Sequence, residues 1–169
     1  ALSGATPLAF MKTNPDAIAK IDLGAAFLGR IPGTIGEVSK LCVLIGAAYL
    51  IIRKVISPKI PLIYIGTVAV FTLLFGGHGF DLYYLACELC AGGLIFGAFF
   101  MATDYVTSPI TPLGQIIFAV MLGILTGLFR LFGGSAEGVS YAIIICNILV
   151  PMINVHTVPK AFGKEGAKK

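Results

Sequence analysis

The chain has 169 residues, of which 57% are hydrophobic and only 12% charged, and its net charge is +4. A soluble domain usually has about 25% charged residues, so this chain has too few charges to cover a water-facing surface, and lipid is its simplest solvent. No basic surface interleaved with aromatic residues is present, which argues against nucleic-acid binding.

Residues 1–35 mix polar and apolar side chains with three prolines and many glycines, so we expect an irregular segment with one short helix near Asp16–Phe27. The segment opens with the motif Ser3-Gly4-Ala5-Thr6-Pro7. The small residues Gly4 and Ala5 leave the Thr6 hydroxyl accessible to a bulky group. A threonine before a proline is also typical of a turn or a cap, and both interpretations stay open at this point.

Five continuous apolar runs follow. Each is expected to be a membrane-spanning helix, because roughly 16–21 residues of helix cross a hydrocarbon core of about 30 Å, the first two runs being on the short side. Backbone groups in lipid need internal partners, and these runs lack the alternation of barrel strands. The runs are Glu37–Ile52, Ile60–Phe75, Leu82–Ala102, Pro112–Phe132 and Ala136–Val155.

The expected fold is therefore an all-α membrane protein of about five transmembrane helices. Residues 36–156 form the bundle, residues 1–35 precede it, and residues 157–169 are a basic tail. Three of the helix starts have capping residues, which are Thr34 with Glu37 as a capping box, Asp81, and Thr111 before Pro112.

The distribution of Lys and Arg predicts the orientation. Arg53, Lys54 and Lys59 lie in one loop, and with five spans this loop is on the same side as the basic tail and the turn around Asp104. This side has more positive charge near the membrane, so we expect it to be cytoplasmic and Thr6 to face outward.

Glu88 is a carboxylate about one third of the way into the third run. Such a group is costly in lipid and is expected to face the bundle or a wet cavity. Its neighbours at i+3 and i+4, Ala91 and Gly92, are small and leave room for a helix or a flat ring. A role in an ion pathway and a protonated carboxyl bonded to another helix are equally open.

Asn147, Pro151 and Asn154 share one face of the last run, where Pro151 cannot donate to the carbonyl of Asn147. This face could bind a cation or the edge of a flavin, or it could be a kink whose groups are satisfied by a neighbouring helix or water. A second polar group is Asp104 with Thr103, Thr107 and Ser108, which we expect on the side opposite Thr6, where it could serve a second flavin or an ion exit.

Two further patterns indicate packing more than chemistry, and a third could bind a phosphate. Cys87 and Cys90 form a C-x-x-C pair in an apolar run, where cysteines pack well, and we expect no metal site. The Gly93-Gly97 and Gly123-Gly127 pairs let helices approach closely. The stretch Thr34-Ile35-Gly36-Glu37 leads into a helix N-terminus that could receive a phosphate, although Glu37 would oppose it electrostatically.

Several longer stretches resemble the D-type membrane subunit of the Rnf electron-transport complex and the related B-type subunit of the sodium-translocating NADH:quinone reductase. They are SGATPLA at 3–9, GEVSKLCVLIG at 36–46, FFMATDYVTSP at 99–109, FGGSAEG at 132–138 and NILVPMIN at 147–154. The resemblance departs from the typical MATDPV at Tyr105, which replaces a proline. The end of the chain shortly after VPMIN fits the Rnf subunit better than the quinone-reductase subunit.

The resemblance implies the second half of an internally duplicated, urea-transporter-like fold and an FMN bound to Thr6 through a phosphoester. It further implies a multi-pass protein of the inner membrane that carries electrons between ferredoxin and NAD, with sodium or proton movement. The implied partners are other subunits, including a second FMN-bearing one. Riboflavin is implied only by the quinone-reductase relative. The alternatives are the quinone-reductase subunit itself, a small-solute channel of the same fold, and a scaffold subunit without flavin.

Overall fold

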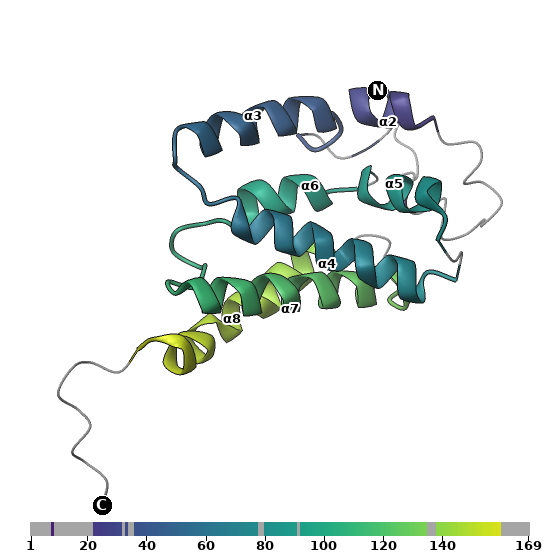
Figure 1. Cartoon of the computed structure of the whole chain (residues 1–169). Helices are drawn as coiled ribbons and strands as arrows, with labels where there is room; N and C mark the ends of the chain where they lie inside the picture. The colour runs from purple at the N-terminus through teal and green to yellow at the C-terminus, as the bar shows by residue number, and fades with distance from the viewer. Residues whose placement is uncertain are drawn as a thin grey trace, which may run out of the picture.

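A computed structural model of the chain describes residues 8, 22–31, 33, 36–77, 80–90, 92–134 and 138–159. Every regular element in these residues is a helix, so the predicted all-α fold is confirmed for the described part (Figure 1). The elements are α2 (Leu23–Leu28), α3 (Lys40–Ile52), α4 (Lys59–Phe75), α5 (Leu82–Cys90), α6 (Leu94–Phe96), the π-helix η2 (Gly97–Met101), α7 (Pro112–Leu131) and α8 (Val139–Thr157).

Helix α3 begins later than the sequence predicted. Ser39 is its N-cap, and the Ser39 hydroxyl accepts a hydrogen bond from the backbone N–H of Cys42 at 3.4 Å. The prediction of a start at Glu37 was wrong because Ser39 takes an extended conformation, with φ of −84° and ψ of 102°, which interrupts any helix that begins at Glu37. Of the short helix predicted near Asp16–Phe27, only α2 lies within the described residues.

The two other predicted caps are confirmed. The Asp81 carboxylate accepts from the N–H groups of Tyr83 at 2.8 Å and Tyr84 at 3.3 Å, which fixes the start of α5. The Thr111 hydroxyl accepts from the N–H of Gly114 at 3.1 Å, with a proline at the first position of α7.

The third predicted span is broken, whereas the sequence predicted one continuous helix over Leu82–Ala102. Helix α5 ends at Cys90, and the segment Leu94–Met101 continues at an angle of 66° to it. The physical reason is Gly92, whose φ of 67° is left-handed and interrupts the helical hydrogen bonds. The second half then widens into η2, where the N–H of Ala102 donates to the carbonyl of Gly97 at 2.8 Å.

Close packing of α4 against α7 forms the centre of the bundle. A Cβ at Gly123 would overlap Thr67, and one at Gly127 would overlap the Phe71 ring, so both glycines are needed for this approach. This confirms the packing role predicted for the pair. The largest apolar core joins α4, α6, η2, α7 and α8, and inside it the hydroxyls of Tyr64 and Thr126 lie 2.6 Å apart.

Within the described residues, two helices, α7 and α8, are long and apolar enough to cross a membrane, and the bent pair of α5 with Leu94–Met101 makes a third if it counts as one span. The apolar helices α3 and α4 have 13 and 17 residues. At a rise of about 1.5 Å per residue they are roughly 20 and 26 Å long, shorter than a hydrocarbon core of about 30 Å. All five predicted runs are thus helical, with fewer full-length spans than runs.

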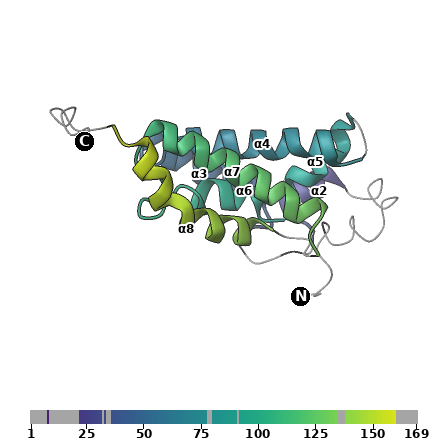
Figure 2. The same cartoon turned by 90° about the horizontal axis from the view of Figure 1, so that it is seen from below.

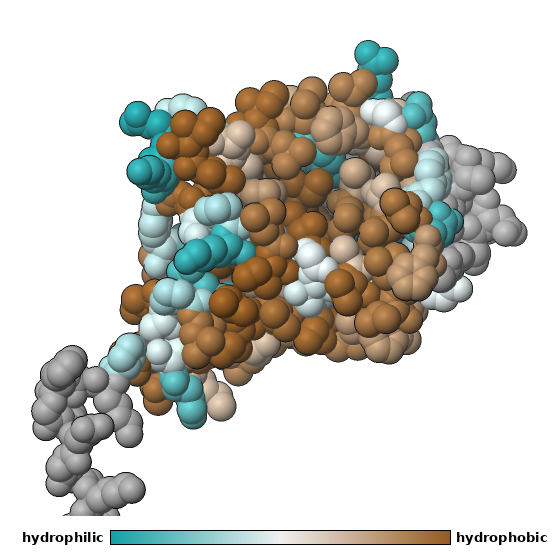
Figure 3. All heavy atoms as spheres, in the orientation of Figure 1, coloured by the Kyte–Doolittle hydropathy of each residue, from teal (hydrophilic) through white to brown (hydrophobic). Residues whose placement is uncertain are grey.

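The helices lie side by side (Figures 1 and 2), and hydrophilic residues gather mainly at two opposite ends of the described part in Figure 3, which we call the two polar rims. At one rim the Tyr105 hydroxyl donates to the carbonyl of Val55, and the hydroxyls of Thr111 and Thr157 are 2.7 Å apart. These contacts bring the loops 53–58 and 102–111 and the end of α8 together, as the sequence predicted. Figure 3 shows a mostly hydrophobic surface between the rims.

Candidate functional site

The break in the third span brings buried charges from three helices together. Glu88 is in the last turn of α5 and Arg130 is in the last turn of α7. The guanidinium Nη1 donates to the backbone carbonyl of Glu88 at 2.6 Å and to its carboxylate at 3.3 Å. Both side chains are under 10% exposed, at 2% for Arg130 and 8% for Glu88. Isolated charges at this depth are costly, so the pairing makes the burial of both tolerable.

Glu88 has a second, weaker partner on its own helix. The Tyr84 hydroxyl, one turn earlier, donates to the other carboxylate oxygen at 3.4 Å. Both oxygens of the carboxylate therefore have a donor, one from α5 and one from α7. The sequence prediction that Glu88 faces the bundle is confirmed, while its role in ion movement stays a prediction.

Lys40 is the second buried cation at the break. It is 2% exposed, although it lies in the first turn of α3. Its ammonium Nζ donates to the backbone carbonyl of Glu37 at 2.5 Å and to that of Gly92 at 2.6 Å. Lys40 thus joins the segment before α3 to the residue that interrupts the third span.

The carboxylate of Glu37 lies against the opposite side of the break. A Cβ at Gly93 would overlap this carboxylate in its present position, so the absence of a side chain at Gly93 leaves room for it. Gly93 is the N-cap of α6, where the free N–H groups of a helix start favour negative charge. The Glu37 carboxylate therefore lies beside the start of the second half of the broken span. Cations bond to the carbonyls of Glu88 and Gly92, near the end of the first half.

Sequence reasoning missed Arg130 and Lys40 as members of this site. A signal was available. Lys40 is early in the first run, Glu88 is early in the third, and Arg130 is late in the fourth, so antiparallel helices place all three at the same rim. Opposite charges at one depth in lipid are expected to pair.

The polar face of α8 is divided. The side chain of Asn154 accepts from the N–H of Ile110 at 3.3 Å and so fixes the loop before α7. Asn147 is closer to the centre of the helix, and its Oδ1 is buried with no hydrogen-bond partner among the described residues. The structure does not join the two amides in one site.

Asp104 and Thr107 lie at the other rim. The Thr107 hydroxyl donates to the Asp104 carboxylate at 3.1 Å, and Asp104 is exposed. Neighbouring Thr103 donates its hydroxyl back to the carbonyl of Phe99 at 2.7 Å, so it closes the end of η2. The predicted grouping of Asp104 with Thr107 is confirmed, and a ligand there remains a prediction.

The motif with Ser3, Gly4, Ala5 and Thr6 lies outside the described residues, as does Thr34. The described residue nearest to Thr6 is Leu8, which is 3% exposed. Two residues of chain span at most about 7 Å, so a group bound at Thr6 would stay close to a buried point of the protein.

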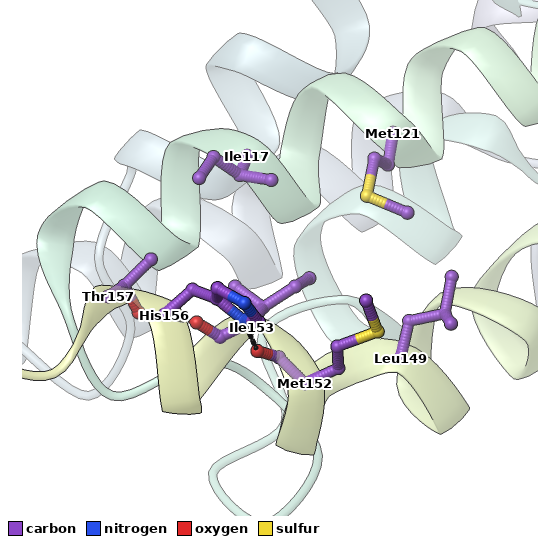
Figure 4. A pocket seen from close by; sticks show the side chains of 7 residues that line it. All are labelled: Ile117, Met121, Leu149, Met152, Ile153, His156 and Thr157. Atoms are coloured by element: carbon purple, nitrogen blue, oxygen red, sulfur yellow. Dashed lines mark hydrogen bonds between the residues drawn. The ribbon is translucent and has the colours of Figure 1, made fainter.

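Two other features lie outside this cluster of buried charges. Cys87 and Cys90 are free thiols, and the described residues contain no cluster of three His, Cys, Asp or Glu side chains that could hold a metal. Between α7 and α8 lies an apolar groove of about 320 Å³, lined by residues such as Met121 and Met152 (Figure 4). At its end the His156 ring Nδ1 is 2.9 Å from the carbonyl of Met152.

Residues 1–163 match the model of the NQR2, RnfD, RnfE family. The D subunit of the Na(+)-translocating ferredoxin:NAD(+) oxidoreductase complex of Acetobacterium woodii is 42% identical over 98% of this chain and 50% of that protein. The D subunit of the proton-translocating ferredoxin:NAD(+) oxidoreductase complex of Clostridium ljungdahlii is 49% identical over 82% of this chain and 42% of that protein.

A third relative, the D subunit of an ion-translocating oxidoreductase complex of Stutzerimonas stutzeri, is 37% identical over 99% of this chain and 50% of that protein. The chain thus spans about half the length of the curated relatives that it matches.

Proposed function

This chain belongs to the NQR2, RnfD, RnfE family, and we propose that it is part of the electron-transferring membrane subunit of an ion-translocating ferredoxin:NAD oxidoreductase complex. We further propose that the subunit holds FMN covalently through a phosphoester to Thr6. The observation that supports this proposal most strongly is the family match over residues 1–163, which includes the Ser3–Thr6 motif and all of the buried charges.

The relatives support the assignment to a complex. Their names describe subunits of ferredoxin:NAD(+) oxidoreductases that translocate Na+ or protons. The proposed partners are the other subunits of such a complex, including a second one that carries FMN, and a riboflavin elsewhere in the complex stays an expectation from the quinone-reductase resemblance. Because the chain covers about half of the relatives, these partners and the whole reaction belong to the complete subunit.

The attachment of a flavin is compatible with the described residues next to the motif. The Thr6 hydroxyl is a suitable acceptor for a phosphoester, and Gly4 and Ala5 leave the approach open. The burial of Leu8 ties this stretch to the protein, so that a flavin tethered there would have a restricted position relative to the bundle. A bound FMN accepts and donates electrons, and the protein determines its position and surroundings.

We propose that the rim with Thr107 and the end of α8 faces the cytoplasm and that Thr6 is on the outer side of the inner membrane. Arg53, Lys54 and Lys59 are exposed at the former rim. Lys40 and Arg130, in contrast, are buried and bonded, so they do not add exposed positive charge to the opposite rim.

The proposal is tested with the full-length subunit in its complex. Thr6→Val removes the acceptor oxygen and keeps the branched shape, so the variant is expected to assemble without flavin fluorescence of this subunit on a denaturing gel. Thr6→Ser keeps an acceptor oxygen and is expected to retain part of the fluorescence, and Ser3→Ala is the matched control that retains all of it. Fluorescence that persists in Thr6→Val would place the flavin on another residue.

The same measurement separates the rival functions. A small-solute channel or a scaffold subunit would contain no flavin that survives denaturation, even in the unmodified protein. A quinone-reductase subunit would contain it, but its complex would reduce quinone with NADH and would not use ferredoxin.

A further inference from the structure

The Lys40 ammonium occupies a position whose ligands are typical of a metal-cation site. Two of its acceptors are backbone carbonyl oxygens, those of Glu37 at 2.5 Å and Gly92 at 2.6 Å. Carbonyls released at a break in a membrane helix are the groups that coordinate monovalent cations in transport proteins. Here a side-chain cation lies where such an ion would bind.

The charges around this point have the pattern of a cation site. The carboxylate of Glu37 lies against Gly93, one residue after the Gly92 carbonyl. The half-helix α5 ends two residues before Gly92, and a helix C-terminus carries partial negative charge. Lys40 itself is 2% exposed, so its charge is held by these groups instead of by water.

Arg130 bonds to a carbonyl four residues before Gly92, because its guanidinium donates to the Glu88 carbonyl and carboxylate together. Glu88 thus has its own counter-charge in a direct ion pair with Arg130.

We propose that the carbonyls of Glu37 and Gly92 form a site for a monovalent cation, and that the Lys40 ammonium is a tethered cation that occupies this site in the conformation seen here. Lys40 and a free ion then exclude one another. If ions pass through this subunit of the ion-translocating complex proposed above, withdrawal of Lys40 opens the site and its return expels the ion. The binding site itself rests only on the geometry of the break.

The test uses the intact complex with Lys40→Met, which keeps most of the apolar stem and removes the ammonium. The probe is Na+, with choline as the control cation at constant ionic strength. The variant is expected to bind an additional Na+ in equilibrium binding with radioactive Na+. Its unfolding temperature is expected to rise by a few degrees in NaCl relative to choline chloride, since a ligand that binds only the folded state stabilises it.

The matched control is Lys59→Met, because Lys59 is exposed at the other rim and its loss removes the same charge. Neither this variant nor the unmodified complex is expected to gain the additional Na+. If Lys40→Met does not assemble, Lys40→Gln carries the test, because its amide can still donate to a carbonyl without a charge.

Lys40→Met or Lys40→Gln with unchanged Na+ binding and equal unfolding temperatures in both salts would overturn the proposal and leave Lys40 as a structural clamp. Covalent flavin is measured in the same samples. An additional Na+ in a complex without covalent flavin would refute the proposed function and support the cation site. Covalent flavin without an additional Na+ would support the proposed function and refute the cation site.

Discussion

The buried pair of Glu88 and Arg130 allows a prediction about stability whose magnitude follows from the contacts. Arg130→Met removes the guanidinium that bonds to the Glu88 carbonyl at 2.6 Å and to its carboxylate at 3.3 Å. Removal of one partner from a buried ion pair costs about 3–5 kcal/mol, because the other charge stays in a poor environment. Glu88→Gln alone keeps an acceptor and is expected to cost about 1–3 kcal/mol.

The double variant Arg130→Met with Glu88→Gln removes both charges. It is expected to be more stable than Arg130→Met alone by about 2 kcal/mol, since no unpaired carboxylate remains. The assay is the fraction of full-length subunit that stays monodisperse in detergent after heating. At about 2–4 °C per kcal/mol for a domain of this size, Arg130→Met lowers the midpoint by roughly 6–20 °C and the second substitution restores part of it.

A double variant that melts at or below the temperature of Arg130→Met would refute this reasoning. Strict additivity of the two single effects would show that the side chains do not interact. Arg30→Met, at an exposed position, is the control for the loss of a positive charge alone.

Three further predictions concern orientation, coupling and packing. A reporter fused after Lys169 should be active only in the cytoplasm, and a cysteine at Thr13 should react with an impermeant label from outside, so protection of Thr13 in intact cells would reverse the orientation. Glu88→Gln should leave the complex assembled but slow ion movement or electron transfer several-fold, and normal rates for both would leave Glu88 with a structural role alone. Gly127→Ala should lower the free energy of unfolding by about 1–3 kcal/mol, and with it the midpoint after heating, because the added methyl group overlaps the Phe71 ring of α4. Gly66→Ala, with nothing within 4 Å of its added Cβ, should not, and equal effects would exclude overlap as the cause.

The all-α membrane fold and most helix bounds were predictable from local patterns. Continuous apolar runs require helices in lipid, and caps such as Asp81 and Thr111 depend on a few neighbouring residues. The shared rim of the loops also followed from the chain order, because antiparallel neighbours alternate sides.

The break at Gly92 was not predicted because the sequence there is as apolar as an intact span. A Gly-Gly pair is tolerated in many membrane helices, and only tertiary partners decide whether the chain turns. Those partners are Lys40 on the Gly92 carbonyl and the Glu37 carboxylate beside Gly93, which are more than 50 residues away in the sequence.

The candidate site was predictable in its components and not in its connections. Glu88 was identified from the cost of a carboxylate in lipid, but its bond to Arg130 depends on how α5 and α7 approach each other. Asn147 and Asn154 share a helical face, yet Asn154 bonds to the loop before α7, because helical spacing does not determine what lies opposite each turn.

The most direct test of the central claim is mass spectrometry of the peptide that ends at Lys12, taken from the full-length subunit purified in its complex. We predict that this peptide carries a flavin linked through a phosphate, and that fragmentation places the modification on Thr6. An unmodified peptide at full occupancy, or a flavin on a different residue, would contradict the account.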